Sequence, residues 1–461
     1  MNQIILQKAY QMVAQIEEKI VEKELDIEKC MPELVKIANA TALDMYHELI
    51  EQADAAIKAA KQERRQEGLV VERKQDSRTL ITSIGDLNYK RTYYWNREKK
   101  QYEYPVDRLL GIEHYERVDP GLSKGLVSCA RTRSYRDSAQ RKCKGSVTAQ
   151  TVMNKIRKAE PVIAECKEKR KVPYLHVDAD EDHVALQRYT HRKSTEVPLV
   201  SVYEGIEHVG KRNRCIGTFH ISEYDKKPEA LWEEVLDRME QRYDLEGTRI
   251  YIHGDGADWI KKGLDWLPKS KFVLDSYHKN KYVTEVVAGC DADEKQMLRT
   301  AIQRAMEDEN TAYFTKAIQY ALEKHPEREE TITDAATYLL NQMEGVSIRK
   351  KEPESQNGGA TEPHVSHVLS DRLSSRPKGW SKETLKHFVP ILANGSEVRM
   401  IRKKQPDLTV VQKRAVKKVR QKYSPGIPSE IRPIFLDTGK QDGWYKLFHS
   451  LIYDDSRITT Q

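Results

Sequence analysis

The sequence lacks the features of secreted, disulfide-rich and membrane-spanning proteins. Its six cysteines are scattered and form no pair at zinc-finger spacing, so we expect reduced thiols rather than disulfides or a zinc site. No run of about 18 apolar residues occurs, and the N-terminus lacks the cationic and then apolar order of a signal peptide. The sequence therefore predicts a soluble cytoplasmic protein without a membrane partner.

Charge is abundant but only slightly unbalanced. Lys and Arg total 78 against 71 acidic residues, a net charge of +7. The excess of cations is concentrated in residues 124–171 and again in residues 402–422. A local excess attracts a polyanion such as DNA, although most charge runs are solvated faces. The length of 461 residues exceeds the ~250–300 at which single cores stop growing, so we expect several domains.

The first part of the chain is expected to be mainly helical and to contain the DNA-binding region. Residues 1–75 are almost free of Gly and Pro and carry apolar residues at three- and four-residue spacing, which predicts helices for packing or self-association. Residues 76–171 begin with alternating and β-branched residues around Gly85 and Asp86, which predict a hairpin. Aromatic residues there are interpreted as structural rather than as DNA contacts.

Three short helices are predicted over residues 122–159. Gly145 is expected to end the second helix in the left-handed conformation, and Ser146 to cap the third. This is the shape of a helix-turn-helix, a shape that also occurs in proteins that never bind DNA. The side chains of the last helix expected to face double-stranded DNA are Thr148, Gln150, Thr151, Asn154 and Lys155.

From residue 172 to residue 395 the pattern is α/β. Candidate strands are residues 174–179, 183–188, 198–203, 218–221, 249–253 and 271–274, with a helix over 228–243. This order predicts an RNase H-like core, in which a mixed five-stranded sheet starts with antiparallel strands and continues through parallel ones. A helical insertion is expected at about 280–350 and a flexible loop at 352–359. The basic tail, 396–461, is expected to be loosely ordered from Arg402.

Acidic residues follow two of the predicted strands. Four carboxylates fall within five residues: Asp178, Asp180, Glu181 and Asp182. Asp178 and Asp180 point to the same face of a strand, whereas Glu181 and Asp182 also fit a polar hairpin turn. Asp255 ends a later strand between Gly254 and Gly256, which permit a close backbone approach. A simple Gly-Asp-Gly turn is the alternative for this motif.

Further polar residues lie near the ends of later elements. Asp275 and His278 follow the last strand and are either supporting groups of a site or a helix cap and a satisfied polar residue. Glu362 precedes Pro363, so we expect Glu362 to be extended at a helix entrance with Pro363 in the first helical position. His364 and His367 have no cysteine or third histidine nearby in the sequence, which argues against zinc there.

Several stretches together resemble the ISLre-type insertion-sequence transposases, a family also classed among uncharacterised bacterial proteins. The likeness is carried by YLHVDADEDHVALQ, SVYEGI, IYIHGDGADWIKKGLDWLPKSKFVLDSYHKNKY and TEPHVSHVLSDRLSSRPKGWS, with SIGDLNYKRTYYW and SYRDSAQ before them. The resemblance implies a DDE catalytic triad at Asp180, Asp255 and Glu362. It favours Asp180 over Asp178 for the first acid, and Asp178 remains an alternative metal ligand.

The resemblance also implies the reaction and its partners. A DDE transposase binds the terminal inverted repeats of a mobile element, cuts the DNA and joins the ends to target DNA. Two Mg²⁺ ions, for which Mn²⁺ can substitute, are the expected cofactor, because hard cations prefer carboxylate oxygens. A homodimer or larger assembly on DNA is expected, since two ends are joined together. The alternatives are an RNase H-like nuclease without strand transfer and a non-catalytic helix-turn-helix DNA-binding protein.

Overall fold

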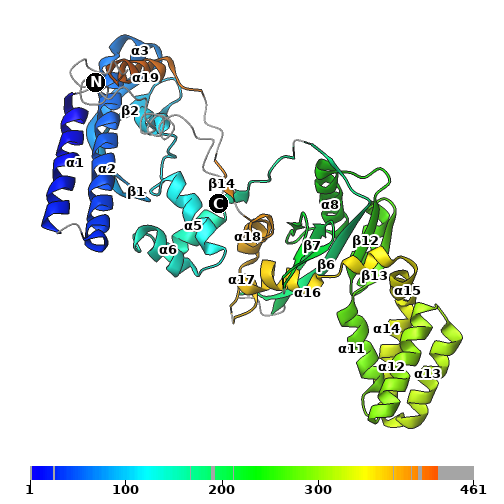
Figure 1. Cartoon of the computed structure of the whole chain (residues 1–461). Coiled ribbons are helices and arrows are strands. Elements are labelled where there is room, and N and C mark those ends of the chain that lie inside the picture. The colour runs from blue at the N-terminus through cyan, green and yellow to red at the C-terminus, as the bar shows by residue number, and fades with distance from the viewer. Residues whose placement is uncertain are drawn as a thin grey trace, which may run out of the picture. The chain divides into compact units, whose positions relative to one another are not determined.

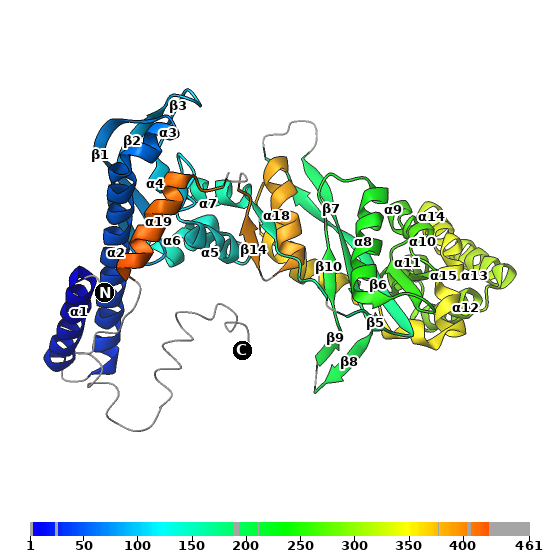
Figure 2. The ribbon, with the colours of Figure 1, turned by 90° about the horizontal axis from the view of Figure 1, so that it is seen from above.

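The chain divides into two compact units, which are described separately. The computed structural model describes residues 3–23, 26–166, 168–187, 193–210, 212–376, 378–395, 397–402 and 407–423. Unit 1 comprises Met1–Asp119 and Lys404–Gln461, and unit 2 comprises Pro120–Lys403 (Figures 1 and 2). The domain boundaries expected after residues 75, 171 and 395 remain predictions.

Unit 1 combines long helices with an antiparallel hairpin. The helices are α1 (Gln3–Glu22), α2 (Ile27–Ala59), α3 (Lys61–Gln66) and α4 (Pro105–Leu109). The strands are β1 (Leu69–Thr82), β2 (Gly85–Asn96) and β3 (Gln101–Glu103), paired in the order β1-β2-β3. The predicted hairpin is confirmed, with Thr82 paired to Gly85 beside the turn. Its first strand starts earlier than the pattern indicated, directly after α3.

The expectation of a loosely ordered tail is wrong for residues 407–423. Helix α19 (Val410–Tyr423) packs against α2, and its Val411 is buried. The Gln412 amide donates to the carbonyl of Pro105 at 2.9 Å. This segment is ordered because it has an apolar face that completes the unit 1 core. Its high content of basic residues concealed that apolar face in the sequence. Residues 424–461 lie outside the described residues.

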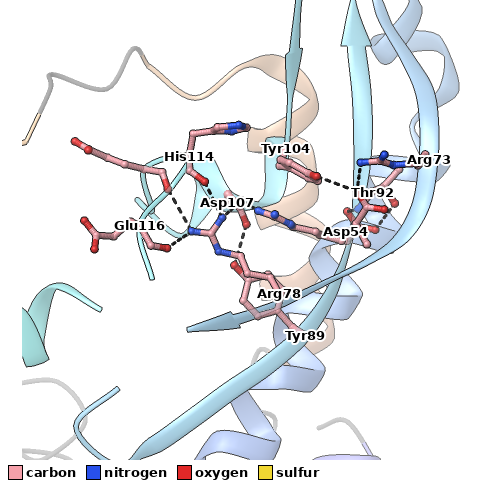
Figure 3. Close-up of polar contacts among 12 residues, drawn as sticks. Asp54, Arg73, Arg78, Tyr89, Thr92, Tyr104, Asp107, His114 and Glu116 are labelled. Carbon is pink, nitrogen blue, oxygen red and sulfur yellow. Dashed lines mark hydrogen bonds and ion pairs between the residues drawn. The ribbon is translucent and has the colours of Figure 1, made fainter. Parts of the chain in front are cut away.

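Buried charges tie the elements of unit 1 together (Figure 3). Asp107 in α4 accepts hydrogen bonds from the Tyr89 hydroxyl at 2.8 Å and from Arg78 Nη1 at 3.0 Å, and it also pairs with Arg91. Asp54 in α2 accepts from the Thr92 backbone N–H at 3.0 Å. A buried charge is tolerated when it is paired and hydrogen-bonded, so these contacts fix α2 and α4 against the hairpin.

Unit 2 contains the mixed five-stranded sheet. Its strands lie in the order β10 (Phe219–Ile221), β7 (Ser194–Tyr203), β6 (Tyr174–Ala185), β12 (Arg249–Gly254) and β13 (Ser270–Leu274). The pairs β10/β7 and β7/β6 are antiparallel, whereas β12 is parallel to both β6 and β13.

One strand replaces two of the predicted strands. Residues 174–185 form the continuous strand β6, in which Glu181 pairs with Pro198 and Asp182 with Val197 of β7. The polar hairpin turn proposed for Glu181 and Asp182 is therefore wrong. The ladder continues through these acids because each has its own partner, a hydrogen bond from Trp259 for Glu181 and one from Ser374 for Asp182.

The apolar face of the sheet carries the main core. Leu175, Val177 and Ala179 of β6 alternate with its acids and are fully buried against helix α8 (Pro228–Arg242), in which Trp232 is fully buried too. The predicted helical insertion is confirmed and extends this core beyond β13 (Figure 1). It consists of α11 (Ser276–Val287), α12 (Ala292–Glu307), α13 (Thr311–Lys324), α14 (Glu329–Asn341) and α15 (Met343–Lys351).

The polar face of the sheet is covered by the chain that follows the insertion. A 3₁₀ turn at Pro353–Asn357 lies within the predicted loop, and α16 (Thr361–Val365) packs on β6 and β7. Glu362 is therefore helical, and the expectation that it is extended before Pro363 is wrong. The first four N–H groups of a helix have no intrahelical partner, so Pro363 fits in the first turn without losing a hydrogen bond.

The helix-turn-helix region precedes the sheet in unit 2. It consists of α5 (Pro120–Ala130), α6 (Tyr135–Cys143) and α7 (Ala149–Ile156). Gly145 is left-handed as predicted, with φ +81°. Ser146 is not the cap of α7, because Thr148 Oγ1 accepts the Thr151 N–H at 3.2 Å. Arg157, just after α7, bonds Ser381 at 3.0 Å, which anchors this region to α18 (Lys382–Asn394).

Short elements complete unit 2. They are β4 (Ala159–Pro161) with β14 (Val398–Met400), β5 (Arg170–Lys171) with β11 (Tyr243–Asp244), β8 (Ile206–Val209) with β9 (Arg212–Cys215), α9 (Asp258–Lys261), α10 (Gly263–Trp266), the 3₁₀ turn Pro326–Arg328, the π-helical turn Ser366–Ser370 and α17 (Asp371–Leu373). Within the described ranges, no helix combines the length and apolarity needed to cross a membrane.

Candidate active site on strand β6 and at the end of strand β12

Two acids lie at corresponding positions along two neighbouring parallel segments, Asp180 within β6 and Asp255 one residue after the end of β12. Asp178 of β6 pairs with His253 of β12, so Asp180 and Asp255 each lie two residues further on and on the same face of the sheet. Burial, and then the negative charge of Asp255, raise the pKa of Asp180 to about 6. The structure therefore brings Asp180 and Asp255 together closely enough for their charges to repel each other.

Glycines allow this close approach, as the sequence predicted. A Cβ atom on Gly254 would lie 2.8 Å from the carbonyl oxygen of Ala179 and 2.8 Å from Ile260 Cδ1. Gly256 has φ +89°, and a Cβ atom there would collide with the side chain of Gln342 in the turn before α15. A side chain at either position would push Asp255 away from β6.

Each of the two carboxylates is oriented by one backbone N–H group. Asp180 Oδ1 accepts from the Glu181 N–H at 2.8 Å, and Asp255 Oδ1 accepts from the Ala257 N–H at 2.9 Å. No described residue hydrogen-bonds the second oxygen of either carboxylate. These oxygens are left for a ligand, and the repulsion between the two charges favours a cation.

Partial compensation for this negative charge comes from a neighbouring pair on α11. Asp275 caps the helix by accepting the His278 N–H at 2.8 Å, and its other oxygen lies 2.7 Å from His278 Nδ1. The hydrogen bond to Asp275 raises the pKa of His278 against the effect of burial, and the charges of Asp255 and Asp180 add to this rise. Both interpretations of the pair thus apply, since Asp275 is a helix cap and His278 faces the acidic site.

Asp178 is engaged in other interactions. It is buried, and its two oxygens lie 2.9 and 3.0 Å from the Tyr203 hydroxyl, which donates to them. His364 Nδ1 lies 3.3 Å from Asp178 Oδ2, and although burial opposes protonation, this carboxylate raises the pKa of His364 to about 9. Asp178 is therefore bound to Tyr203 and His364, which favours Asp180 as the ligand.

Glu362 does not form a three-carboxylate cluster with Asp180 and Asp255. It is exposed on α16, two residues before His364. Among the described residues, the group of three possible metal ligands whose donor atoms all lie within 4.8 Å of one another is Cys290, Glu294 and His325, so Asp180, Asp255 and Glu362 do not meet this condition. The contact between His364 and Asp178 connects α16 to β6.

A buried histidine pair beneath the acids was not predicted. His176 Nδ1 lies 3.0 Å from His253 Nε2, and Gly358 covers both rings. Burial lowers the pKa of His176 to about 4 and lowers the pKa of His253 well below its ordinary value, so both are neutral at physiological pH. The signal was present in the sequence, because each histidine precedes an acid by two residues, His176 before Asp178 within β6 and His253 before Asp255 at the end of β12.

A basic cleft of about 1040 Å³ lies between the α5–α6 turn and the segment before α18. Arg131, Arg372, Arg376 and Lys378 are among its lining residues. Burial, and then the charges of Arg372 and Arg376, lower the pKa of Lys378, and burial lowers that of Arg131. These cations crowd one another in the cleft, an arrangement that favours an anionic ligand.

The predicted DNA-reading side chains fall into two groups. Gln150 and Asn154 are exposed on α7 and hydrogen-bond each other at 3.2 Å, and Thr148 is exposed at the cap, while Thr151 is half-buried. Lys155 is buried, with only 6% of its surface exposed. Its expected DNA-facing position is therefore wrong, because it lies on the face of α7 that also buries Val152 and Ile156.

Comparisons with known proteins place the chain in a family. The sequence model of the Uncharacterised protein family (UPF0236) matches residues 20–405. A UPF0236 protein of Caldanaerobacter subterraneus subsp. tengcongensis is 36% identical over 408 residues, covering 86% of this chain and 85% of the relative. A second UPF0236 protein from the same organism is 35% identical over 466 residues, covering 98% of this chain and 97% of the relative.

The names of these relatives give loci rather than an activity. The first name carries eleven locus numbers of one genome and the second carries four. The two matches and the family model agree over most of the sequence, so this chain belongs to the UPF0236 family.

Proposed function

We propose that this protein is a metal-dependent enzyme that cuts and joins DNA, a DDE transposase of a bacterial insertion sequence built on an RNase H-like core. The observation that carries the proposal is the position of Asp180 in β6 beside Asp255, which directly follows the neighbouring parallel strand β12. In the described part of the chain one oxygen of each carboxylate has no hydrogen-bond partner, and burial and then the charge of Asp255 raise the pKa of Asp180. Acids at the carboxyl ends of parallel strands are where α/β sheets commonly place their sites.

The donor set fits a hard divalent cation. Asp180 and Asp255 offer carboxylate oxygens, which Mg²⁺ prefers. Within the described ranges neither carboxylate forms an ion pair with a Lys or Arg side chain. When bound, two Mg²⁺ ions would supply the positive charge that activates an attacking oxygen and stabilises a leaving one. Asp180 and Asp255 would hold the ions, and Glu362 is proposed as the third carboxylate after its side chain turns toward them.

Other residues of this chain would orient the two acids. The Glu181 and Ala257 N–H groups fix one oxygen of each carboxylate. The Tyr338 hydroxyl donates to the Asp255 carbonyl and fixes the turn after β12. Asp178 with Tyr203, and the neutral His176–His253 pair, pack against the same face of the sheet. Their packing would hold the strands that carry the two acids in place.

Two features support DNA as the substrate. The exposed Gln150 and Asn154 on α7 are residue types that bind adenine edges in the major groove. The cleft lined by Arg131, Arg376 and Lys378 supplies cations for phosphates. A helix that reads bases and a cleft that holds the backbone would present an element end to the enzyme.

The relatives' names support the proposal that the protein is encoded by a mobile element. One relative's name covers eleven loci of a single genome and another's covers four. A protein encoded at many loci of one genome is what an element that copies or moves itself produces. The proposal extends this property to the present chain, which shares its family.

A strand-transfer assay tests the proposal. The full-length protein would be incubated with Mg²⁺ and DNA ends chosen by searching the sequence on either side of the gene for inverted repeats, pre-cut to expose a 3′-hydroxyl, together with a plasmid target. We expect joined products with wild-type protein and none with Asp180→Asn.

The controls distinguish the alternatives. The matched variant is Asp258→Asn, because Asp258 is exposed on α9 only three residues after Asp255, and it should join ends normally. Cleavage without joined products would identify a nuclease, and DNA binding without either reaction would identify a non-catalytic DNA-binding protein. Either result overturns the transposase proposal.

A further inference from the structure

The helical insertion contains a mixed cluster of side chains that is separate from the acidic site. Cys290 lies between α11 and α12, Glu294 is in the first turn of α12, and His325 is the C-terminal cap of α13. One ligand atom of each lies within 4.8 Å of those of the other two. We propose that Cys290, Glu294 and His325 bind a zinc ion that holds the ends of these three helices together.

The contacts of the two ring nitrogens of His325 support a metal site. Its Nδ1 lies 3.3 Å from Glu327 Oε1, and its Nε2 is buried without a hydrogen-bond partner in the described part of the chain. Histidines that bind metals commonly give one ring nitrogen to a carboxylate and the other to the ion. A buried polar atom without a partner is costly, and coordination through Nε2 would remove that cost.

Cys290 and Glu294 provide the other two donors. Cys290 is buried, with 4% of its surface exposed, and is a free thiol. Glu294 Oε1 accepts from the Tyr320 hydroxyl at 3.2 Å and lies 3.8 Å from Lys324 Nζ. Lys324 is half-exposed, so its ammonium group can turn to solvent when a cation takes its place.

The donor set selects zinc over magnesium. One sulfur, one nitrogen and one oxygen donor suit Zn²⁺, which takes Cys, His and carboxylate ligands in tetrahedral geometry. Mg²⁺ prefers oxygen donors alone. With three protein ligands, the fourth position would be taken by water. The Cys290 thiol would lose its proton to solvent when zinc binds. The sequence pattern did not reveal this site because His325, at the end of α13, is distant in the sequence from Cys290 before α12 and Glu294 in its first turn.

Cobalt titration of the full-length, metal-stripped protein tests the site. Co²⁺ takes the place of Zn²⁺ and gives a thiolate-to-cobalt charge-transfer band together with the visible bands of a tetrahedral ion. We expect both to saturate at one equivalent per chain and to disappear when Zn²⁺ is added. Cys290→Ser and His325→Gln should each abolish the charge-transfer band or weaken binding at least about tenfold, with unchanged far-UV circular dichroism.

The exposed Cys166 provides the matched control. Cys166→Ser should bind cobalt as the wild type does. Retention of the band in folded Cys290→Ser, or absence of a band at one equivalent in wild type, would overturn the proposal. If Cys290→Ser does not fold, His325→Gln with the cysteine intact decides: an unchanged titration again refutes the site. Neither readout involves DNA or Mg²⁺, so the result is independent of the proposed function.

Discussion

Replacing Asp180 with Asn is expected to stabilise the metal-free protein. Burial, followed by the charges of Asp255 and Glu181, raises the pKa of Asp180 from 3.8 to about 6. The folded chain therefore resists ionisation of this carboxyl group, whereas the unfolded chain does not. Asn has a similar shape and no charge, so it removes this cost.

The magnitude follows from the shift of about two pKa units. Each unit corresponds to about 1.4 kcal/mol, giving an upper bound of about 3 kcal/mol. Because Asp180 is only partly buried, solvent screens part of this unfavourable energy. We therefore expect the variant to gain about 1–3 kcal/mol in the free energy of unfolding. The folded-state pKa is the higher one, so the penalty in wild type grows as pH rises from about 4 to about 6. The advantage of the variant should be full at about pH 8 and absent below about pH 4.

Urea unfolding followed by tryptophan fluorescence measures this effect. Four tryptophans, Trp232, Trp259, Trp266 and Trp380, lie in unit 2, and the Trp259 indole donates to Glu181 beside the site. The measurement is made with EDTA and repeated with Mg²⁺, which should stabilise wild type and leave Asp180→Asn unchanged. Loss of stability in the variant at about pH 8, or a difference that does not change with pH, would refute the like-charge site.

Three further substitutions test the packing around the site and in unit 1. Gly254→Ala should cost about 1–3 kcal/mol of stability in thermal unfolding and impair DNA cleavage, because its methyl group meets the Ala179 carbonyl; a neutral effect would contradict the close approach. His364→Gln should lower the free energy of unfolding most below about pH 6.5 and progressively less as pH rises through about 9, because the pKa of His364 is raised to about 9. A loss of stability that is independent of pH would argue against the ion pair between His364 and Asp178. Asp107→Asn should cost about 3–5 kcal/mol in urea unfolding, since it leaves two buried arginines without their carboxylate; a cost below about 1 kcal/mol would contradict that pairing.

Most of the strands of the sheet were predictable because the patterns that specify them are local. Apolar residues alternate with polar ones at the start of β6, and glycines follow the β-branched run of β12, so the start of β6, the end of β12 and Asp255 stood out. The continuity of β6 through Glu181 and Asp182 was not predictable, since it depends on hydrogen bonds from Trp259 and Ser374, which are distant in the sequence.

The supporting residues of the site were hidden for the same reason. Tyr203, His364 and the His176–His253 pair act on one another across strands and across the α16 segment, and single-strand patterns do not show such contacts. The position of Lys155 was predicted wrongly because a charged residue is normally expected to be exposed, even when the residues beside it on the helix face are apolar. The basic residues of α19 likewise concealed the buried Val411, which only the neighbouring α2 explains.

Cleavage of element-end DNA in Mg²⁺ is the most direct test of the central claim that Asp180 and Asp255 form a metal-dependent catalytic site. Wild type, Asp255→Asn and Asp258→Asn would be compared at equal DNA occupancy, with EDTA as the blank. The account predicts Mg²⁺-dependent nicking by wild type and Asp258→Asn, and none by Asp255→Asn even though it binds the DNA. Equal cleavage by Asp255→Asn and wild type would contradict it.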